Sequence, residues 1–255
     1  MDQLTEEQLH RYTHHIILKD IGGEGQRQLL AARVLIVGAG GLGSPAALYL
    51  AAAGVGGIGI IDDDRVELSN LQRQILYCTA DLGRSKVASA ADKIAALNPD
   101  VKVFAIEDRL RRENADQILS EYDFIIDASD NFDTKYLIND VCVAIGRPFS
   151  HAGVAGFKGQ VFTYAPGSPC LRCIFPEPPA PGQIQHCRGA GILGAAAGVF
   201  GSIQAAEAIK SILKKDGGLR ARLLSIDLIE MDFANMGVSQ NPACACNFQC
   251  GPSKK

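Results

Sequence analysis

The residues best suited to chemistry begin with a glycine-rich turn at the end of an apolar segment. The segment RVLIVGAGGLGS (33–44) runs from branched aliphatic residues into Gly38, Gly40, Gly41 and Gly43. A strand that turns into a helix through such glycines lets backbone N–H groups approach a phosphate closely. The pattern is shared by proteins that bind a dinucleotide for hydride transfer and by proteins that consume ATP. The glycines alone therefore do not choose between these ligands.

The residues after the glycine turn favour one of the two ligands. A dinucleotide-binding protein needs an acidic residue about 20 positions past the glycines for the ribose hydroxyls, and Asp62 fits that spacing. The segment DDDRVELSNLQRQ (62–74) then adds Asp64 and an arginine, Arg73. Hydride transfer has no role for this arginine, whereas Arg73 and Lys86 can both bind the phosphates of a nucleoside triphosphate.

A later carboxylate supplies the metal ligand that a triphosphate needs. Asp130 ends the segment DASD (127–130), directly after an apolar run, and can hold magnesium. Open parallel sheets bind ligands at the carboxyl ends of their strands, so Arg73, Lys86 and Asp130 are expected to face one crevice. Positioned charges of this kind stabilise a reacting phosphate without a covalent enzyme step.

The elements that must position these groups alternate between strand and helix. This rhythm predicts an α/β fold with a doubly wound, Rossmann-like and mostly parallel sheet. Strands are expected at 33–38, 57–62, 101–106 and 122–127, and helices at 43–53, 85–97, 113–121 and 131–146. Before the sheet, residues 5–18 predict an amphipathic helix with a capping box at Thr5 and Gln8, and a second short helix follows it.

The pattern changes after residue 148. FKGQVFTYAPG (157–167) alternates as a strand, and the proline-rich segment 174–186 predicts a mobile surface loop. A long helix is expected at about 193–214, followed by a strand-like segment, 220–227, and a cysteine-bearing tail. No repeat or low-complexity linker divides the chain.

Composition excludes several classes of partner. Hydrophobic residues make up 47% of the 255 residues, the formal net charge is −3 and the pI is about 6.0. This balance gives no basic surface for nucleic acid or an anionic membrane. No signal peptide or membrane-spanning segment is evident, so a cytoplasmic location with protein and small-molecule partners is expected.

Eight cysteines point to a metal site rather than to disulfides in a reducing compartment. Cys170 and Cys173 have the spacing of a zinc knuckle, and Cys244, Cys246 and Cys250 lie far downstream. Two pairs of thiolates would form a closed, structural zinc site that joins the tail to the body of the protein. Free thiols without metal are the alternative.

Taken together, the motifs resemble the MoeB/ThiF/HesA family of ubiquitin-activating-enzyme-like adenylyltransferases over nearly the whole chain. They are VGAGGLGS, SNLQRQ, the RSK that ends in Lys86, DASDN, CLRC and CRGAGILG. The resemblance implies a homodimer that uses ATP and magnesium to activate the C-terminal glycine of a ubiquitin-fold sulfur carrier of the MoaD/ThiS kind. The products would be an acyl-adenylate and pyrophosphate. A sulfurtransferase or cysteine desulfurase would complete sulfur transfer in molybdopterin, thiamine or a related biosynthesis.

The resemblance also implies a division of the chain and a set of site residues. One adenylation domain (1–255) would comprise N-terminal helices (1–32), a nucleotide-binding half (33–150) and a carrier-binding half with a crossover loop and the zinc site (151–255). The expected catalytic residues are Arg73, Lys86, Asp130 and Cys187. The expected nucleotide-binding residues are His14, Gly38, Gly40, Gly41, Gly43, Asp62, Asp64, Ser69, Asn70, Leu71, Gln72, Arg73, Lys86, Asp130 and Asn131.

Three positions qualify this expectation. Cys187 matches a cysteine that in some family members carries a thioester or acyl-disulfide, and a spare thiol is the alternative. His14 stands where the family has an arginine that reaches the ATP of the opposite subunit. The family's second cysteine pair reads P-x-C-x-x-C-G, whereas this chain has Asn247 at the second cysteine. Cys250, which keeps the Cys-Gly dipeptide, is therefore the expected fourth zinc ligand, with Cys246 as the alternative.

Two other functions compete with adenylation. A carrier-binding scaffold that no longer adenylates would account for the departures at His14 and in the cysteine tail. A nicotinamide-dependent oxidoreductase would keep the glycine turn but leave Arg73, Lys86 and Asp130 without a role.

Overall fold

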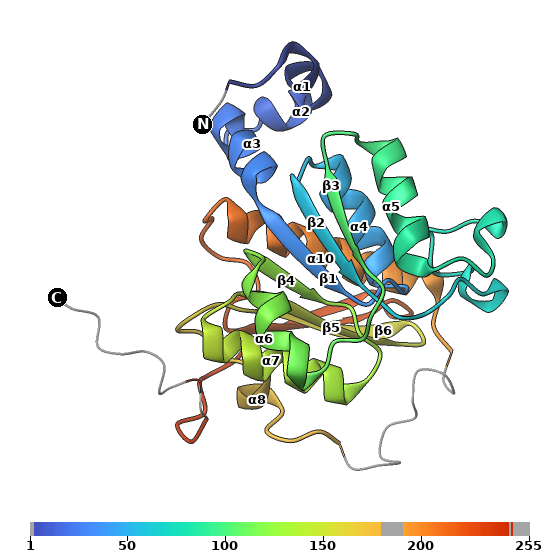
Figure 1. Cartoon of the computed structure of the whole chain (residues 1–255). Coiled ribbons are helices and arrows are strands. Elements are labelled where there is room, and N and C mark those ends of the chain that lie inside the picture. The colour runs from blue at the N-terminus through green and yellow to red at the C-terminus, as the bar shows by residue number, and fades with distance from the viewer. Residues whose placement is uncertain (1–2, 180–190, 245, 247–255) are drawn as a thin grey trace.

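One eight-stranded sheet organises the protein (Figure 1). The computed structural model describes residues 3–179, 191–244 and 246. The strands lie in the order β3-β2-β1-β4-β5-β6-β7-β8. They are β1 (Arg33–Val37), β2 (Gly57–Ile61), β3 (Lys102–Ile106), β4 (Phe124–Asp127), β5 (Phe149–Ala155), β6 (Lys158–Tyr164), β7 (Arg222–Asp227) and β8 (Asp232–Gly237).

The sheet has a parallel half and an antiparallel half. Strands β3, β2, β1 and β4 pair in parallel, as the alternating pattern predicted, and β5 continues the parallel pairing beside β4. Strands β5 to β8 pair antiparallel; short turns join β5 to β6 and β7 to β8, whereas α8 and α10 lie between β6 and β7. Two strands were not expected from the sequence, β5 and β8. Gly153 interrupts the pattern of β5, and β8 is exposed along most of its length, so neither strand shows a regular apolar alternation.

Helices cover both faces of the sheet, which accounts for the apolar character of the parallel strands. On one face, α4 (Gly43–Ala52), α5 (Lys86–Leu97) and α10 (Gly194–Ile212) pack on Val34, Ile36, Ile58 and Ile126. On the other face, α6 (Arg112–Ser120), α7 (Phe132–Ile145) and α8 (Leu171–Ile174) cover Leu35, Val37, Ile125 and Phe149 (Figure 1). Among the described residues, no helix is both long and apolar enough to cross a membrane.

The N-terminal helices lie at the amino ends of the strands. The single helix expected over 5–18 is wrong: it is divided at Tyr12 into α1 (Glu6–Arg11) and α2 (Thr13–Ile16), and α3 (Gly22–Ala31) follows. The division is explained by Tyr12, which turns inward and is buried. Its hydroxyl hydrogen-bonds to Asp100 and accepts from Asn98, just before β3. The capping box of Thr5 and Gln8 is confirmed.

Candidate functional site

The glycine turn between β1 and α4 is packed so closely that side chains are excluded at two positions. Gly38 has φ of +98°, and a Cβ there would stand 2.7 Å from the carbonyl oxygen of Ala128, at the end of β4. A Cβ at Gly43 would collide with the carbonyl oxygen of Gly38. The turn therefore lies directly against the carboxyl end of β4, between that strand and β2.

Asp62 and Lys86 lie beside this turn. The Asp62 carboxylate accepts hydrogen bonds from the backbone N–H of Ala39 at 2.7 Å and of Asp64 at 2.8 Å. The Lys86 ammonium is buried, 2.7 Å from the Asp64 carboxylate and 3.9 Å from that of Asp62. Burial raises the pKa of Asp62, and the charge of Lys86 opposes that rise. A buried cation is thus held at the edge where a phosphate would lie.

The segment that follows β2 brings an arginine to the same place. The Arg73 guanidinium donates to the carbonyl oxygen of Ser69 at 3.1 Å, and its Cγ lies 3.4 Å from where a Cβ of Gly41 would stand. Asn70 is buried and closes a reciprocal cap with Glu67. The other residues of the segment take different positions. Leu71 packs against the core and Gln72 donates to the carbonyl oxygen of Ile192, before α10.

Asp130 and Asn131 occupy the carboxyl end of β4. Asp130 is exposed to solvent. Asn131 is the N-cap of α7 and accepts from the backbone N–H of Thr134 at 2.9 Å. The register pairs Val37 with Asp127, so Asp130 follows the strand that directly neighbours the glycine turn.

Sequence reasoning missed a buried polar network beneath Asp130. The Asp127 carboxylate is fully buried and accepts from the hydroxyl of Ser129 at 2.6 Å, from Lys135 at 3.3 Å and from the His151 ring at 2.7 Å. Lys135 also donates to the carbonyl oxygen of Ala152 at 2.9 Å. Asp127 and Lys135 are eight residues apart in the sequence, but His151 lies on β5, which the sequence did not predict.

The three titratable groups of this network influence one another. Burial alone would raise the pKa of Asp127, but the charge of Lys135 and the His151 hydrogen bond outweigh it and lower that pKa to about 2. Burial, and then the Lys135 charge, lower the pKa of His151 from its usual 6.5. The network therefore holds an ionised Asp127 carboxylate and a neutral His151 imidazole at neutral pH.

A cavity of about 260 Å³ lies beside the start of α7. Its lining residues come from the β3–α6 connection and from the first two turns of α7: Arg109, Leu110, Arg111, Asn131, Asp133, Thr134 and Leu137. The Arg109 side chain also contacts Asp63 at 3.4 Å, so the cavity borders the Asp62–Asp64 segment. Its lining combines two leucines with charged and polar side chains, so it offers both apolar and polar contacts to a ligand.

Two expected residues are not brought to this site within the described part of the chain. His14 is exposed on α2, at the amino ends of the strands, whereas the glycine turn and Asp130 lie at the carboxyl ends. A five-residue strand separates these edges by about 16 Å. Cys187 lies outside the described residues.

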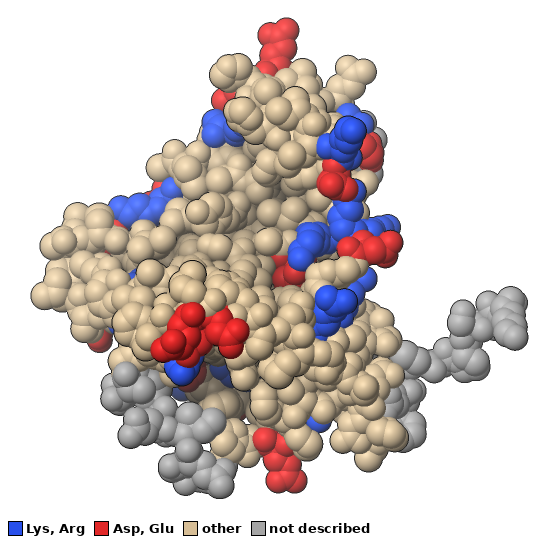
Figure 2. All heavy atoms as spheres, turned by 180° about the vertical axis from the view of Figure 1, so that it is seen from behind, with Lys and Arg blue, Asp and Glu red and all other residues tan. Residues whose placement is uncertain are grey.

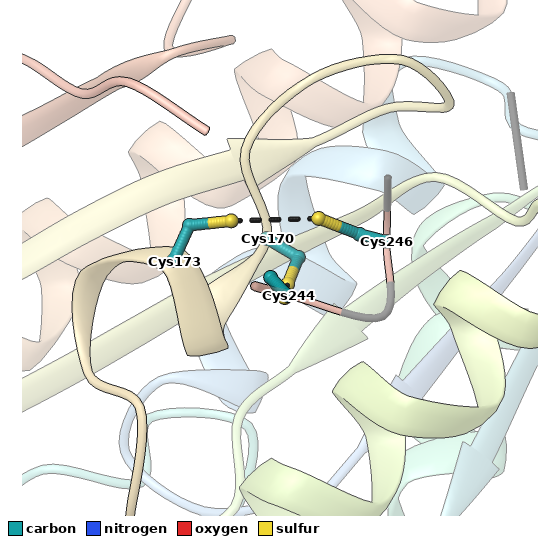
Figure 3. Close-up of side chains that lie close together, drawn as sticks. All are labelled: Cys170, Cys173, Cys244 and Cys246. Atoms are coloured by element: carbon teal, nitrogen blue, oxygen red, sulfur yellow. Dashed lines mark hydrogen bonds between the residues drawn. The ribbon is translucent and has the colours of Figure 1, made fainter. Parts of the chain in front are cut away.

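Four cysteines form a separate cluster (Figure 3). The Sγ atoms of Cys170, Cys173, Cys244 and Cys246 all lie within 4.8 Å of one another. The closest pairs are Cys170–Cys244 at 3.5 Å and Cys173–Cys246 at 3.4 Å. Tetrahedral zinc with bonds of about 2.3 Å requires sulfur atoms about 3.8 Å apart, so this donor set fits zinc.

The cluster contains Cys246, the alternative fourth ligand, and the expected choice of Cys250 is not tested by it. Cys246 completes the cluster, while Cys250 lies outside the described residues. Four thiolates are the full ligand number of a tetrahedral zinc site. Burial and the neighbouring Cys244 thiol raise the pKa of Cys170 to about 12. A cation is needed to keep such a cluster as thiolates at neutral pH.

Comparison with known proteins agrees with this geometry. A sequence model of the ThiF family matches residues 12–247, which is most of the chain. The chain belongs to the ThiF family. Among solved structures, the ThiF-family chain is similar to E. coli MccB crystallised with MccA-N7isoAsn, with a TM-score of 0.79 and 25% identity. The match covers 92% of this chain and 74% of MccB.

Two of the curated relatives of this ThiF-family chain carry related names. The SAMP-activating enzyme E1 of Haloferax volcanii is 48% identical over 237 residues, covering 93% of this chain and 88% of the relative. The sulfur carrier protein adenylyltransferase of Thermus thermophilus is 46% identical over 246 residues, covering 94% and 91%.

The His151 network predicts a loss of stability on mild acidification. His151 binds a proton less readily in the folded protein than in the unfolded chain, so the free energy of unfolding should fall as the pH falls below 6.5. Between pH 7.5 and pH 5.5, His151→Asn should lose less stability than the wild type, by at most about 1.4 kcal/mol, because the lower pH lies one unit below the usual pKa of 6.5. Urea denaturation at both pH values measures this. Equal pH dependence in the two proteins would contradict it.

Proposed function

We propose that this ThiF-family chain is an ATP-dependent adenylyltransferase that activates the C-terminal glycine of a ubiquitin-fold sulfur carrier. The observation that carries the proposal is the meeting of Arg73, Lys86 and Asp130 around one glycine turn. The names of the two curated relatives support the same activity and the same class of partner.

The chemistry requires charge stabilisation rather than a nucleophile on the enzyme. The carrier carboxylate attacks the α-phosphorus, a P–O bond forms, and the bond to pyrophosphate breaks. Arg73 and Lys86 would bind the phosphate oxygens, on which negative charge increases. Lys86 forms an ion pair with Asp64, and a bound phosphate would replace that carboxylate as the partner of Lys86. Asp130 would hold magnesium, which neutralises phosphate charge when bound.

The adenosine end of ATP would occupy the cavity at the start of α7. Leu110 and Leu137 give that cavity an apolar surface, and Asn131 links it to the Asp130 end of the site. Asp62 borders the same region and carries the expected ribose contact. Its two backbone hydrogen bonds leave one lone pair on each oxygen for a hydroxyl.

The carrier would dock on two turns of the antiparallel half. β7 runs in the same direction as β5, so the turn after β5 and the turn after β7 lie at the nucleotide edge of the sheet. Leu228 donates its backbone N–H to the carbonyl oxygen of Phe157 at 3.1 Å, which holds the two turns together. These turns and β8 expose large apolar side chains: Phe157, Ile229, Met231, Phe233 and Met236.

A homodimer would complete the nucleotide site. His14 lies too far from the site of its own chain and can approach ATP only from a second copy. The outer side of α10 presents Ala195, Gly198 and Ser202, and Tyr49 on the neighbouring α4 is 60% exposed. Figure 2 views the side opposite to Figure 1, where charged residues gather in a few clusters with wide uncharged areas between them. Such a surface suits burial against a second copy.

Zinc would be held by the four-cysteine cluster. Cys170 and Cys173 flank the start of α8, and Cys244 and Cys246 belong to the tail beyond β8 (Figure 3). The metal would therefore tie the tail to α8, on the face of the sheet that also carries α7. Four protein ligands leave no open position, so its role would be structural.

The first prediction concerns the magnesium ligand. Asp130→Ala should abolish carrier-dependent exchange of pyrophosphate into ATP while the melting temperature stays near that of the wild type, because the side chain is exposed. Arg73→Ala should lower the rate by about 100-fold or more. Asp116→Ala, an exposed aspartate on α6, is the matched control and should retain full activity. Carrier binding without exchange in the wild type would indicate a scaffold instead.

The second prediction concerns the docking surface. Met231→Asp should raise the KM for the carrier at least ~10-fold, because a charge would be desolvated in an apolar contact, and should leave the Kd for ATP unchanged. Ile145→Asp, at the far end of α7, places the same charge on another exposed apolar residue and serves as control. Steady-state exchange at varied carrier concentration measures both. Unchanged KM in Met231→Asp would remove these turns from the interface.

The third prediction distinguishes the zinc ligands. Protein purified without added metal should hold one zinc atom per chain by elemental analysis. Cys246→Ser should release that zinc and lower the melting temperature, since three sulfur ligands bind it more weakly. Cys250→Ser should leave both unchanged. Zinc lost from Cys250→Ser and kept in Cys246→Ser would reverse the assignment.

A further inference from the structure

The glycine turn is held from two sides by side chains that contact the same residue. The backbone N–H of Ala39 donates to Asp62, and its carbonyl oxygen accepts from the Tyr77 hydroxyl at 2.9 Å. Tyr77 is buried, and burial and the nearby carboxylates, Asp62 first among them, raise its pKa. The Tyr77 hydroxyl therefore keeps its proton and remains a hydrogen-bond donor across the working pH range.

This contact sets the direction of the next backbone N–H group. The peptide bonds of the described chain are trans, so the carbonyl of Ala39 and the N–H of Gly40 point in opposite directions. The Ala39 carbonyl points toward the buried Tyr77 hydroxyl, so the Gly40 N–H points away from Tyr77. Among the described residues, the N–H groups of Gly40 and Gly41 have no hydrogen-bond acceptor. They are available to an anionic oxygen of a bound nucleotide.

We propose that Tyr77 is a positioning residue for ATP, one that fixes the 39–40 peptide so that the Gly40 N–H faces the nucleotide. The proposal rests on the function proposed above. The peptide needs this restraint because Gly40 has no side chain and tolerates positive φ. Without the hydroxyl, rotation of the peptide would exchange the N–H for a carbonyl oxygen, which repels phosphate. Loss of the hydroxyl would also leave the buried Ala39 carbonyl unpaired if the peptide kept its present orientation.

The experiment compares Tyr77→Phe with Tyr122→Phe. Tyr122 is also buried against the sheet, but its hydroxyl lies beside Gly59 near the amino end of β4. Tyr77→Phe should raise the Kd for ATP about 5- to 30-fold by titration calorimetry, while Tyr122→Phe leaves it unchanged. Exchange at saturating ATP should stay within about threefold of the wild type, because the catalytic charges are intact. Hydrogen exchange of residues 38–44 should show less ATP-induced protection in Tyr77→Phe.

A double-mutant cycle with Gly40→Ala tests the peptide rotation itself. A Cβ at residue 40 has room, since its nearest neighbour would be the Gln74 amide at 3.7 Å, and alanine disfavours positive φ. In the Gly40→Ala background, Tyr77→Phe should therefore raise the Kd less than half as much as it does in the wild-type background. Comparing ratios within each background removes any direct effect of the alanine on ATP.

Three outcomes would overturn the proposal. A Kd for Tyr77→Phe within twofold of the wild type would show that the hydroxyl does not position the turn. A large fall in melting temperature with unchanged ATP affinity would make Tyr77 structural only. If the wild type does not bind ATP, the proposed function and the positioning role of Tyr77 are both overturned. If the wild type binds ATP normally and Tyr77→Phe binds it equally well, only the role of Tyr77 is overturned.

Discussion

The site depends on a buried carboxylate that the surrounding protein keeps ionised. Asp127 ends β4, and its hydrogen bonds to Ser129, Lys135 and His151 join the turn before Asp130 to α7 and β5. Removal of one partner would leave a charge unpaired in the interior, which is strongly destabilising. The exposed Asp130 can thus sit at a strand end with a fixed direction, because the residues beneath it cannot rearrange at low cost.

Much of the parallel half follows from local sequence rules. Strands between helices, glycines after β1 and acidic residues after β2 each predict their own position, and the parallel sheet brings their carboxyl ends together. The closeness of Gly38 to Ala128, and of Arg73 to Gly41, agrees with the expected crevice. These contacts lie between neighbouring strand ends, which is why their sequence patterns predict them well.

The parts that sequence reasoning missed depend on contacts between distant segments. His151 pairs with Asp127 only because β5 joins the sheet beside β4, and the sequence of β5 carries no clear strand pattern. Tyr77 looks like an ordinary core residue until its hydroxyl is placed against the glycine turn. The approach of Cys246 to Cys170, Cys173 and Cys244 likewise depends on where the tail returns to α8. No spacing rule predicts this approach, because Cys246 and Cys250 both fit the family pattern imperfectly.

Strand direction would allow one edge of the sheet to bind both the nucleotide and the carrier of the proposed function. The parallel strands place the candidate nucleotide-binding residues at their carboxyl ends. Strand direction then reverses twice, at β6 and at β7, so the turn after β7 lies at the same edge. One reversal more or fewer would have put the apolar residues around Ile229 and Met231 at the opposite edge of the sheet. A carrier docked on these turns would lie at the same edge as Asp130. The terminus of the carrier would then have a shorter distance to span to the nucleotide. In the proposed function, the change from parallel to antiparallel pairing at β5 would therefore serve carrier docking as well as the sheet itself.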